Sequence, residues 1–200
     1  MTDASNSGGP QTIQSVETAL TILEFIRDNE DAGVTEIADE FGRSKSTIHH
    51  YLATLAEYGY LEKAEGRYRL GMRFLTLGGT VREQEPLYHL GRDDVDRLAR
   101  ETGEKARLIV ERDGHGITLY QSAGEHADDT RTHVGSIEEL YCTAAGKAFL
   151  ANLPAERVEQ YLSETPLHAY TENTITEPEE LRDELDTIRS RGIAVDDEER

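Results

Sequence analysis

Hydrophobic residues recur with a helical period in two short stretches that flank residue 42. Ile37 and Phe41 share one face of the first stretch, and Ile48 and Leu52 share one face of the second. Gly42 separates them, at a position where a helix end favours a residue that tolerates positive φ. A short helix, a glycine turn and a second helix packed across the first are typical of a helix-turn-helix.

The outward face of the second predicted helix carries small hydrogen-bonding side chains. Ser44 is its expected N-cap, and no Asp or Glu occurs between Arg43 and Ala56, although the chain as a whole is acidic. Such a face is typical of a helix that contacts phosphates and base edges. The alternative is an ordinary amphipathic helix pair without a role in DNA binding, because it would show the same apolar spacing. The candidate DNA-contacting residues of the two helices are Thr35, Arg43, Ser44, Lys45, Ser46, Thr47, His49 and His50.

A β-hairpin is predicted after this helix, over Leu61–Leu70, with its turn at Glu65-Gly66. Together with a further helix predicted before residue 29, the two helices and this hairpin form a winged helix. Arg67 and Arg69 alternate outward on the second strand, and we interpret them as wing contacts to the DNA backbone or the minor groove. The alternative is that both are ordinary solvated charges.

Two more helices are predicted on either side of this unit. The first runs from Ser15, its expected N-cap, to about Asp28, and residues 29–33 form a loop after it. It should pack behind the helix-turn-helix through a stripe of Val16, Ala19, Leu20, Leu23 and Ile26. Residues 72–85 are predicted as a linker helix whose apolar strips offer a seam for dimerisation. The candidate dimerisation residues are Met72, Leu75, Gly78 and Gly79.

The C-terminal half mixes alternating and helical patterns. A helix is expected from about residue 87 to 102, and the later helices at 143–153, 155–162 and 177–191, the last with a capping box at Thr176–Glu179. Strands are expected at 106–110, 117–120, 131–134 and 193–195. Interleaved strands and helices indicate an α+β or α/β sensor domain, and we assign the chain to the α+β class. The predicted domains are a disordered start at 1–14, a winged helix-turn-helix at 15–71, a linker helix at 72–85 and an effector-binding domain at 86–200.

Charge changes this picture in one respect. The net charge is −19, which is unusual for a nucleic-acid binder. Residues 43–82, however, hold seven Lys and Arg against three Glu, a local charge of +4. The composition, with abundant Asp and Glu and only four lysines, resembles that of proteins from salt-accumulating halophiles. In such proteins an acidic surface stays soluble because salt screens its self-repulsion.

Several classes of site are not expected. Cys142 is the only cysteine, which fits a reducing cytoplasm and excludes an intrachain disulfide. No apolar run approaches the ~20 residues of a membrane span, and the seven histidines lack metal-ligand spacing, so no membrane, metal or cofactor is predicted. Cys142 and His133 are the candidates for a nucleophile and a base, but a lone cysteine is more often a small buried hydrophobe, and no enzyme is expected.

Three blocks of the sequence resemble the IclR family of transcriptional regulators. They are SKSTIHHYLATL at Ser44–Leu55 followed by Tyr68–Gly71, then TAAGKA at Thr143–Ala148, and LDTIRSRGIAVDDEE at Leu185–Glu199. The resemblance implies a winged helix, a linker helix and an effector-binding domain with a GAF-like fold. It also implies a repressor or activator that binds palindromic promoter sites as a dimer or dimer of dimers and responds to small metabolites, often carboxylates. The alternative function is a winged helix used only for protein–protein contact.

The same resemblance implies where the effector binds. The loop that enters the helix after Thr143 lines the pocket in the family, and a helix N-terminus with free N–H groups suits a carboxylate. The alternative is that the Ala-Ala-Gly run serves only tight helix–sheet packing. Family members continue for some tens of residues beyond the Asp-Asp-Glu-Glu block, which leaves two alternatives here: an effector-binding domain with an incomplete sheet, or a sequence that is a fragment of a longer chain. The candidate effector-binding residues are Cys142, Thr143, Ala144, Ala145, Gly146 and Asp196.

Overall fold

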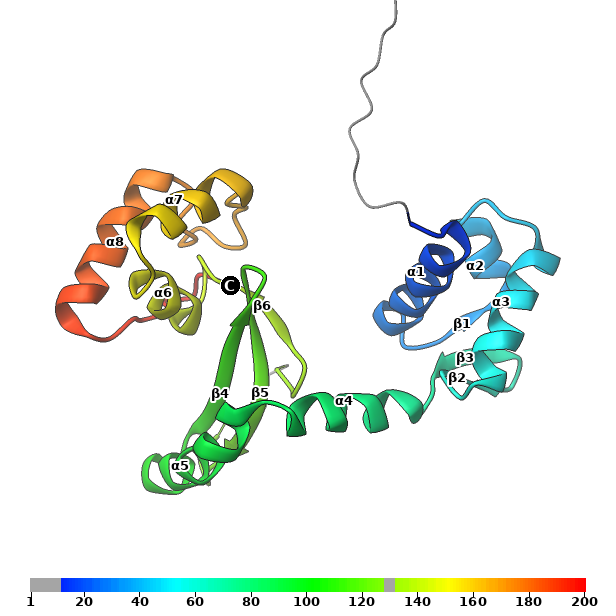
Figure 1. Cartoon of the computed structure of the whole chain (residues 1–200), viewed down its shortest axis with the longest axis horizontal. Helices are drawn as coiled ribbons and strands as arrows, with labels where there is room; N and C mark the ends of the chain where they lie inside the picture. Colours follow the sequence, from blue (N-terminus) through cyan, green and yellow to red (C-terminus); the bar gives the residue numbers. More distant parts are fainter. Residues whose placement is uncertain (1–11, 128–131) are drawn as a thin grey trace, which may run out of the picture. The chain divides into compact units, whose positions relative to one another are not determined.

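The structure, a computed structural model, describes residues 12–127 and 132–200. It divides into two compact units, Met1–Val81 and Arg82–Arg200 (Figure 1). Most of the predicted disordered start lies outside the described residues. The first unit is mainly helical and the second combines helices with a three-stranded antiparallel sheet, which confirms the α+β class.

The N-terminal unit is a winged helix. Its core consists of buried aliphatic side chains from the three helices and two of the three strands, together with Tyr68 of the remaining strand, which is 3% exposed. The strand order of the small sheet is β1-β3-β2, with both pairs antiparallel. Its elements are α1 (Gln14–Asp28), β1 (Ala32–Gly33), α2 (Val34–Glu40), α3 (Lys45–Glu57), β2 (Leu61–Ala64) and β3 (Arg67–Leu70).

Local sequence accounts for the turns of this unit. Gly42 has a φ of 58°, as the turn between α2 and α3 requires. The side chain of Ser44 accepts a hydrogen bond from the N–H of Thr47 at 3.2 Å and caps α3. Glu65 and Gly66 both have positive φ, at 52° and 84°, which is the conformation of a two-residue hairpin turn. These three predictions are confirmed.

The prediction for α1 is wrong in two respects. The helix begins at Gln14 with no side-chain hydrogen bond at its N-cap, so Ser15 does not cap it. Ile26 of the predicted stripe is fully buried, as is Ile22 outside it, whereas Val16 and Leu20 of the stripe are 51% and 55% exposed. Apolar residues lie on two faces of α1, and periodicity alone does not decide which face packs. The predicted loop at 29–33 also contains β1, a strand too short to have an alternating pattern.

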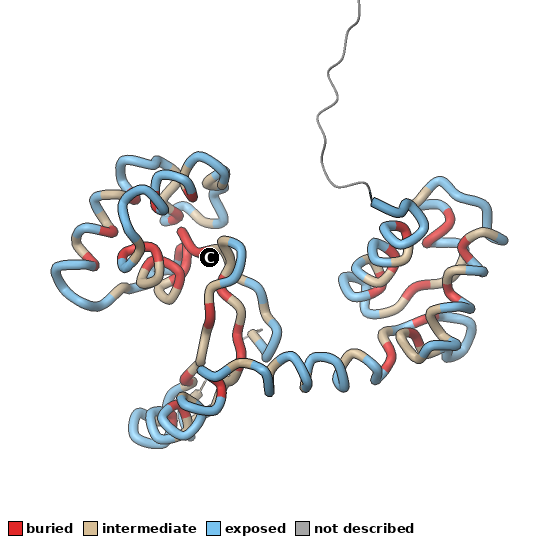
Figure 2. The backbone as a smooth tube through the Cα atoms, viewed as in Figure 1, coloured by how far each residue is buried: buried red, intermediate tan, exposed pale blue. Residues whose placement is uncertain are grey.

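Helix α4 (Arg73–Glu83) has no buried residue, and Figure 2 draws it in pale blue and tan. Met72, just before it, and Leu75 and Val81 within it are 66%, 68% and 60% exposed. A Cβ atom added to Gly78 or Gly79 would meet nothing within 4 Å. Phe74 packs edge-to-face on Tyr60, with 5.4 Å between the ring centroids, and Arg82 lies over the ring of Tyr88, whereas Met72, Leu75 and Val81 leave an apolar strip exposed.

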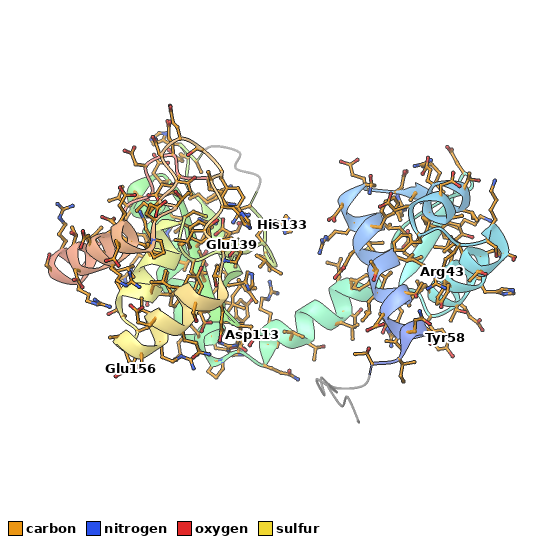
Figure 3. The ribbon with its side chains drawn as sticks, turned by 90° about the horizontal axis from the view of Figure 1, so that it is seen from above. Arg43, Tyr58, Asp113, His133, Glu139 and Glu156 are labelled. Atoms are coloured by element: carbon orange, nitrogen blue, oxygen red, sulfur yellow. The ribbon has the colours of Figure 1, made fainter. Side chains whose placement is uncertain are left out.

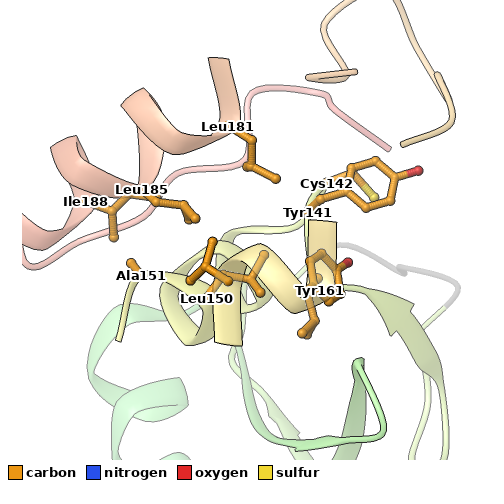
Figure 4. Packing of buried hydrophobic residues seen from close by; sticks show 10 residues of the cluster. Tyr141, Cys142, Leu150, Ala151, Tyr161, Leu181, Leu185 and Ile188 are labelled. Carbon is orange, nitrogen blue, oxygen red and sulfur yellow. The ribbon is translucent and has the colours of Figure 1, made fainter. Parts of the chain in front are cut away.

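The C-terminal unit has two layers of packing. In the sheet, β5 lies between β4 and β6. Helix α5 covers this sheet and packs on it through Tyr88, Val95 and Ala99. Leu150, Leu181 and Leu185 belong to a second core among the last three helices (Figure 4). The elements are α5 (Pro86–Thr102), β4 (Lys105–Arg112), β5 (His115–Ala123), β6 (Ile137–Glu139), α6 (Ala144–Ala151), α7 (Ala155–Glu164) and α8 (Pro178–Arg191).

Three predictions for this unit are wrong. The third strand is Ile137–Glu139, and residues 132–134 are not a strand; Arg131 lies outside the described residues. Ile193–Val195 is irregular and pairs with no described strand, which leaves Ile193 70% exposed. Helix α8 has Glu177 at its N-cap without a side-chain hydrogen bond, so there is no capping box, although Pro178 lies in the first turn as predicted.

Candidate nucleic-acid interface and effector site

Helix α3 presents a continuous exposed face. Ile48 and Leu52 are fully buried, so the residues on the opposite side of the helix, Ser46, His50 and Ala53, point away from the core and are exposed. Lys45 and His49 are also exposed, on one flank of this face. Sequence analysis missed Ala53, because a methyl group offers neither charge nor a hydrogen bond, yet it can contact a thymine methyl.

Thr47 lies on the other flank of α3 and is only half exposed. Its hydroxyl is 2.8 Å from the hydroxyl of Ser44, which is itself 3.0 Å from that of Ser46. The structure therefore brings these three predicted residues together as one hydrogen-bonded group at the start of α3. An apolar groove of about 530 Å³ between α1 and α3 is lined by Thr47 and His50 together with Val16.

Unpaired positive charge is found next to this group. Arg43, labelled in Figure 3, reaches Thr18 only at 3.5 Å, and neither it nor Lys45 forms an ion pair with a described residue. Thr35 is exposed in the first turn of α2. The N-terminal end of α3 thus combines two free cations with several hydroxyl groups, which is a chemistry suited to phosphate.

The wing arginines differ from this arrangement. Arg67 forms ion pairs with Asp31 at 2.5 Å and Glu36 at 2.9 Å, and Arg69 pairs with Glu62 at 2.9 Å. The hydrogen bonds from Arg67 and from the N–H of Gly33 lower the pKa of the Glu36 carboxyl. Both guanidinium groups point outward as predicted, but their charges are compensated within the unit.

The segment proposed to bind an effector is largely built into the core. Cys142 is fully buried, and burial raises the pKa of its thiol to about 11. The hydroxyl of Thr143 donates to the carbonyl of Glu139 at 3.0 Å and accepts from the N–H of Gly146 at 3.2 Å. A Cβ atom on Gly146 would lie 2.2 Å from the carbonyl oxygen of Leu140, so backbone packs tightly there.

Ala144 and Ala145 remain half exposed at the start of α6. Ala145 lines a groove of about 520 Å³ between α6 and β4, which is also lined by Arg107, Ile109 and Phe149. Arg107 pairs with Glu138 at 3.0 Å. The structure does not bring Asp196 into this groove: Asp196 is exposed, and its carboxylate accepts a hydrogen bond from the N–H of Glu199 at 3.0 Å.

Sequence analysis missed the buried charges behind this segment. Lys147 is 2% exposed, and its Nζ donates to Glu199, which is 4% exposed, while Glu184 lies 3.5 Å away. The hydroxyl of Thr174 donates to the carbonyl of Glu199 at 2.6 Å. These contacts fasten Glu199 to α6 and to the segment before α8, and the only signal in the sequence was a lysine within an otherwise small and apolar run.

The residues of the enzyme alternative do not form a dyad. His133 is exposed on the loop before β6, where its Nδ1 lies 2.9 Å from the carbonyl of Val134 (Figure 3). Cys142 lies in the core (Figure 4), and no hydrogen bond joins the two within the described ranges. Among residues 12–127 and 132–200 there is no group of three His, Cys, Asp or Glu arranged for a metal ion, and no helix long and apolar enough to cross a membrane.

Sequence profiles of one family match both units. The profile described as "IclR helix-turn-helix domain" matches residues 15–65, and "Bacterial transcriptional regulator IclR C-terminal" matches residues 80–200. The chain is 38% identical over 201 residues to the "Probable HTH-type transcriptional regulator ArcR" of Halobacterium salinarum, covering 98% of this chain and 76% of that protein. It is 30% identical over 192 residues to the "Transcriptional repressor IclR" of Escherichia coli, covering 94% and 70%.

Solved structures agree with these matches. The crystal structure of Thermotoga maritima IclR superposes with a TM-score of 0.73 and 34% identity, over 94% of this chain and 77% of that one. The matched proteins are DNA-binding transcriptional regulators with an effector domain, not enzymes. With both units matched in the same order, this chain belongs to the IclR family of transcriptional regulators.

Proposed function

We propose that this chain binds operator DNA as a homodimer through α3 and that a small carboxylate metabolite, bound by the C-terminal unit, changes its affinity for DNA. The observation that carries the proposal is the exposed face of α3, which carries no Asp or Glu before Glu57 in its last turn. Ser46, His50 and Ala53 face outward there, and Arg43 and Lys45 lie unpaired at its N-terminal end. In a chain of net charge −19, the absence of Asp and Glu from Arg43 to Ala56 fits contact with phosphates and base edges.

The metabolite acts by differential affinity. A ligand that binds one arrangement of the dimer better than another shifts the population toward that arrangement, and with it the spacing of the two α3 helices. The N–H groups of Ala144 and Ala145 at the start of α6 suit a carboxylate, because they are not used by the Thr143 cap. The proposed effector contacts are therefore the N–H groups of Ala144 and Ala145, two of the six candidate residues named from the sequence.

The setting proposed for this function is a salt-rich cytoplasm. The acidic composition and the relative from Halobacterium salinarum favour a halophilic source, and the free thiol of Cys142 fits a reducing compartment. High salt weakens phosphate contacts by counterion release. Base contacts and dimerisation would then supply a larger share of operator affinity.

Replacement of His50 by alanine is expected to weaken binding to a selected operator by about 1–3 kcal/mol and to relax the preference for its sequence, because one base contact is lost. Fluorescence anisotropy with operators selected from a random library measures both effects. Lys45→Ala is the control, since loss of a phosphate contact lowers affinity for all sequences alike. If His50→Ala kept the full preference, α3 would not be the reading helix. A protein that binds no duplex at all would support an interaction module instead.

Replacement of Leu75 by aspartate is expected to convert the dimer into a monomer. The strip formed by Met72, Leu75 and Gly79 has no partner within the described chain, and a charge in the seam between two copies would be buried without compensation. One winged helix also buries too little surface for high specificity, so two half-sites are expected. Light scattering in high salt gives the mass, with Thr80→Asp beside the strip as the control. A wild-type monomer at micromolar concentration would contradict this seam.

A further inference from the structure

Arg67 is bonded to the corner between β1 and α2 by all three of its guanidinium nitrogens. Its Nε donates to the Asp31 carboxylate at 2.5 Å, and its Nη1 and Nη2 donate to the two oxygens of Glu36 at 3.0 and 2.9 Å. Nη2 also donates to the backbone carbonyl of Asp31 at 3.3 Å. Four of the five N–H donors of an arginine are thus engaged, in the bidentate geometry that a carboxylate favours.

The same corner is held by the backbone. Glu36 accepts a third hydrogen bond from the N–H of Gly33 at 2.9 Å, and Gly33 is the residue that pairs with Arg67 between β1 and β3. Strand β1 has only two residues, so its ladder with β3 is short. The Arg67 side chain adds a second set of bonds between the same two segments, beside Tyr68, which is buried opposite Ala32.

These bonds oppose a phosphate contact. To reach a phosphate, the guanidinium would have to release Asp31 and Glu36, and two carboxylates would then lie next to DNA. Both carboxyl groups are ordinary acids that are ionised near neutral pH, and the hydrogen bonds from Arg67 and Gly33 lower the pKa of Glu36 further. Even with Arg67 in place, one cation faces two anions, so this corner carries a net negative charge. Arg43 and Lys45, by contrast, have no ion pair within the described residues.

We propose that Arg67 is a positioning residue that fixes the wing to the β1–α2 corner, and that Arg43 and Lys45 are the residues that bind DNA phosphate. The second part rests on the proposed function. The wing then contributes to binding through its fixed position. The interpretation of Arg67 as a phosphate contact, which outward alternation on β3 favoured, is replaced by this one.

The first test needs no DNA. Arg67→Gln and Glu36→Gln are expected to lower the melting temperature of the N-terminal unit by less in the double variant than the sum of the two single effects, because both break the shared Arg67–Glu36 contact. Arg67→Lys should restore little of the lost stability, since an ammonium cannot form the two parallel hydrogen bonds that the planar guanidinium makes with the Glu36 carboxylate. Arg69→Gln, which breaks the ion pair between Arg69, 61% exposed, and Glu62, 41% exposed, is the control and should change little. Additive effects of the two single variants, or full rescue by lysine, would overturn the positioning role.

The second test uses a duplex of mixed sequence titrated over a range of salt in which circular dichroism shows each variant folded. Lys45→Gln and Arg43→Gln should each reduce the slope of log K against log salt by about one. Arg67→Gln should weaken binding several-fold with an unchanged slope, giving a parallel line. A slope reduced by about one in Arg67→Gln would overturn the proposal. If the wild-type chain bound no duplex at any salt, the proposed function and the phosphate role of Arg43 and Lys45 would fail, while the melting cycle would still decide the role of Arg67.

Discussion

Replacement of Lys147 by methionine is expected to lower the free energy of unfolding of the C-terminal unit by about 3–5 kcal/mol. Lys147 and Glu199 are 2% and 4% exposed and are bonded to each other, and Glu184 lies 3.5 Å from the same Nζ. Methionine fills a similar volume but leaves the Glu199 carboxylate buried without a counter-charge. One of its oxygens already lacks a hydrogen-bond partner among the described residues, so no local donor compensates.

Urea unfolding followed by circular dichroism measures this loss, provided that the transition of the C-terminal unit is resolved from that of the winged helix. The matched control is Lys147→Met with Glu199→Leu, which removes both charges and should recover most of the stability. The winged-helix transition should be unchanged in both variants. A loss below about 1 kcal/mol in the single variant would mean that Glu199 is hydrated or protonated and that the ion pair has little structural importance.

Replacement of Gly146 by alanine is expected to destabilise the same unit by about 3 kcal/mol or more, the upper end of what overpacking costs. The added Cβ would lie 2.2 Å from the carbonyl oxygen of Leu140 and 2.3 Å from its Cα. Both atoms belong to the backbone, so no side-chain rotation relieves the clash. Ala145, one residue earlier, is half exposed and lines the groove beside Arg107. Ala145→Leu should therefore fill the groove while leaving the melting temperature nearly unchanged.

The two variants separate packing from ligand binding in the Ala-Ala-Gly run. Calorimetry reports stability, and operator titration with and without a panel of small carboxylates reports the response. We expect Gly146→Ala to lose stability whether or not a ligand is present, and Ala145→Leu to keep operator binding but lose the response. A fully responsive Ala145→Leu variant would refute the pocket assignment. Equal destabilisation by both would show that the whole run serves packing.

Local patterns predicted the features that depend on neighbours in sequence. The cap at Ser44, the left-handed Gly42 and the two-residue turn at Glu65-Gly66 each involve residues within a few positions of one another. The apolar spacing of Ile48 and Leu52 likewise determines which face of α3 is exposed. For this reason the winged helix and its outward face were predictable from the sequence alone.

Features that depend on distant partners were not predictable. The partner of Arg67 is 31 positions away at Glu36, and that of Lys147 is 52 positions away at Glu199. An outward arginine looks the same in the sequence whether it faces water, phosphate or a carboxylate. Val16 and Leu20 are as apolar as Ile22, and only the packing of the other helices selects the buried face of α1. The strand expected at 193–195 failed for the same reason, because a strand needs a pairing partner.

The rigidity of the solvent-exposed helix α4 depends on whether its apolar strip is buried. Isolated helices shorter than ~12–15 residues are marginal in water, and each glycine costs roughly 1 kcal/mol of helix propensity. Helix α4 has 11 residues, no buried side chain and two adjacent glycines, so in a lone copy its helix–coil equilibrium is close to balance. In the dimer proposed above, burial of its apolar strip by a second copy would shift that equilibrium toward helix. Dilution of the protein below the dimer dissociation constant would then convert α4 from a rigid helix into a flexible linker, and ligand binding to one unit would no longer affect the other.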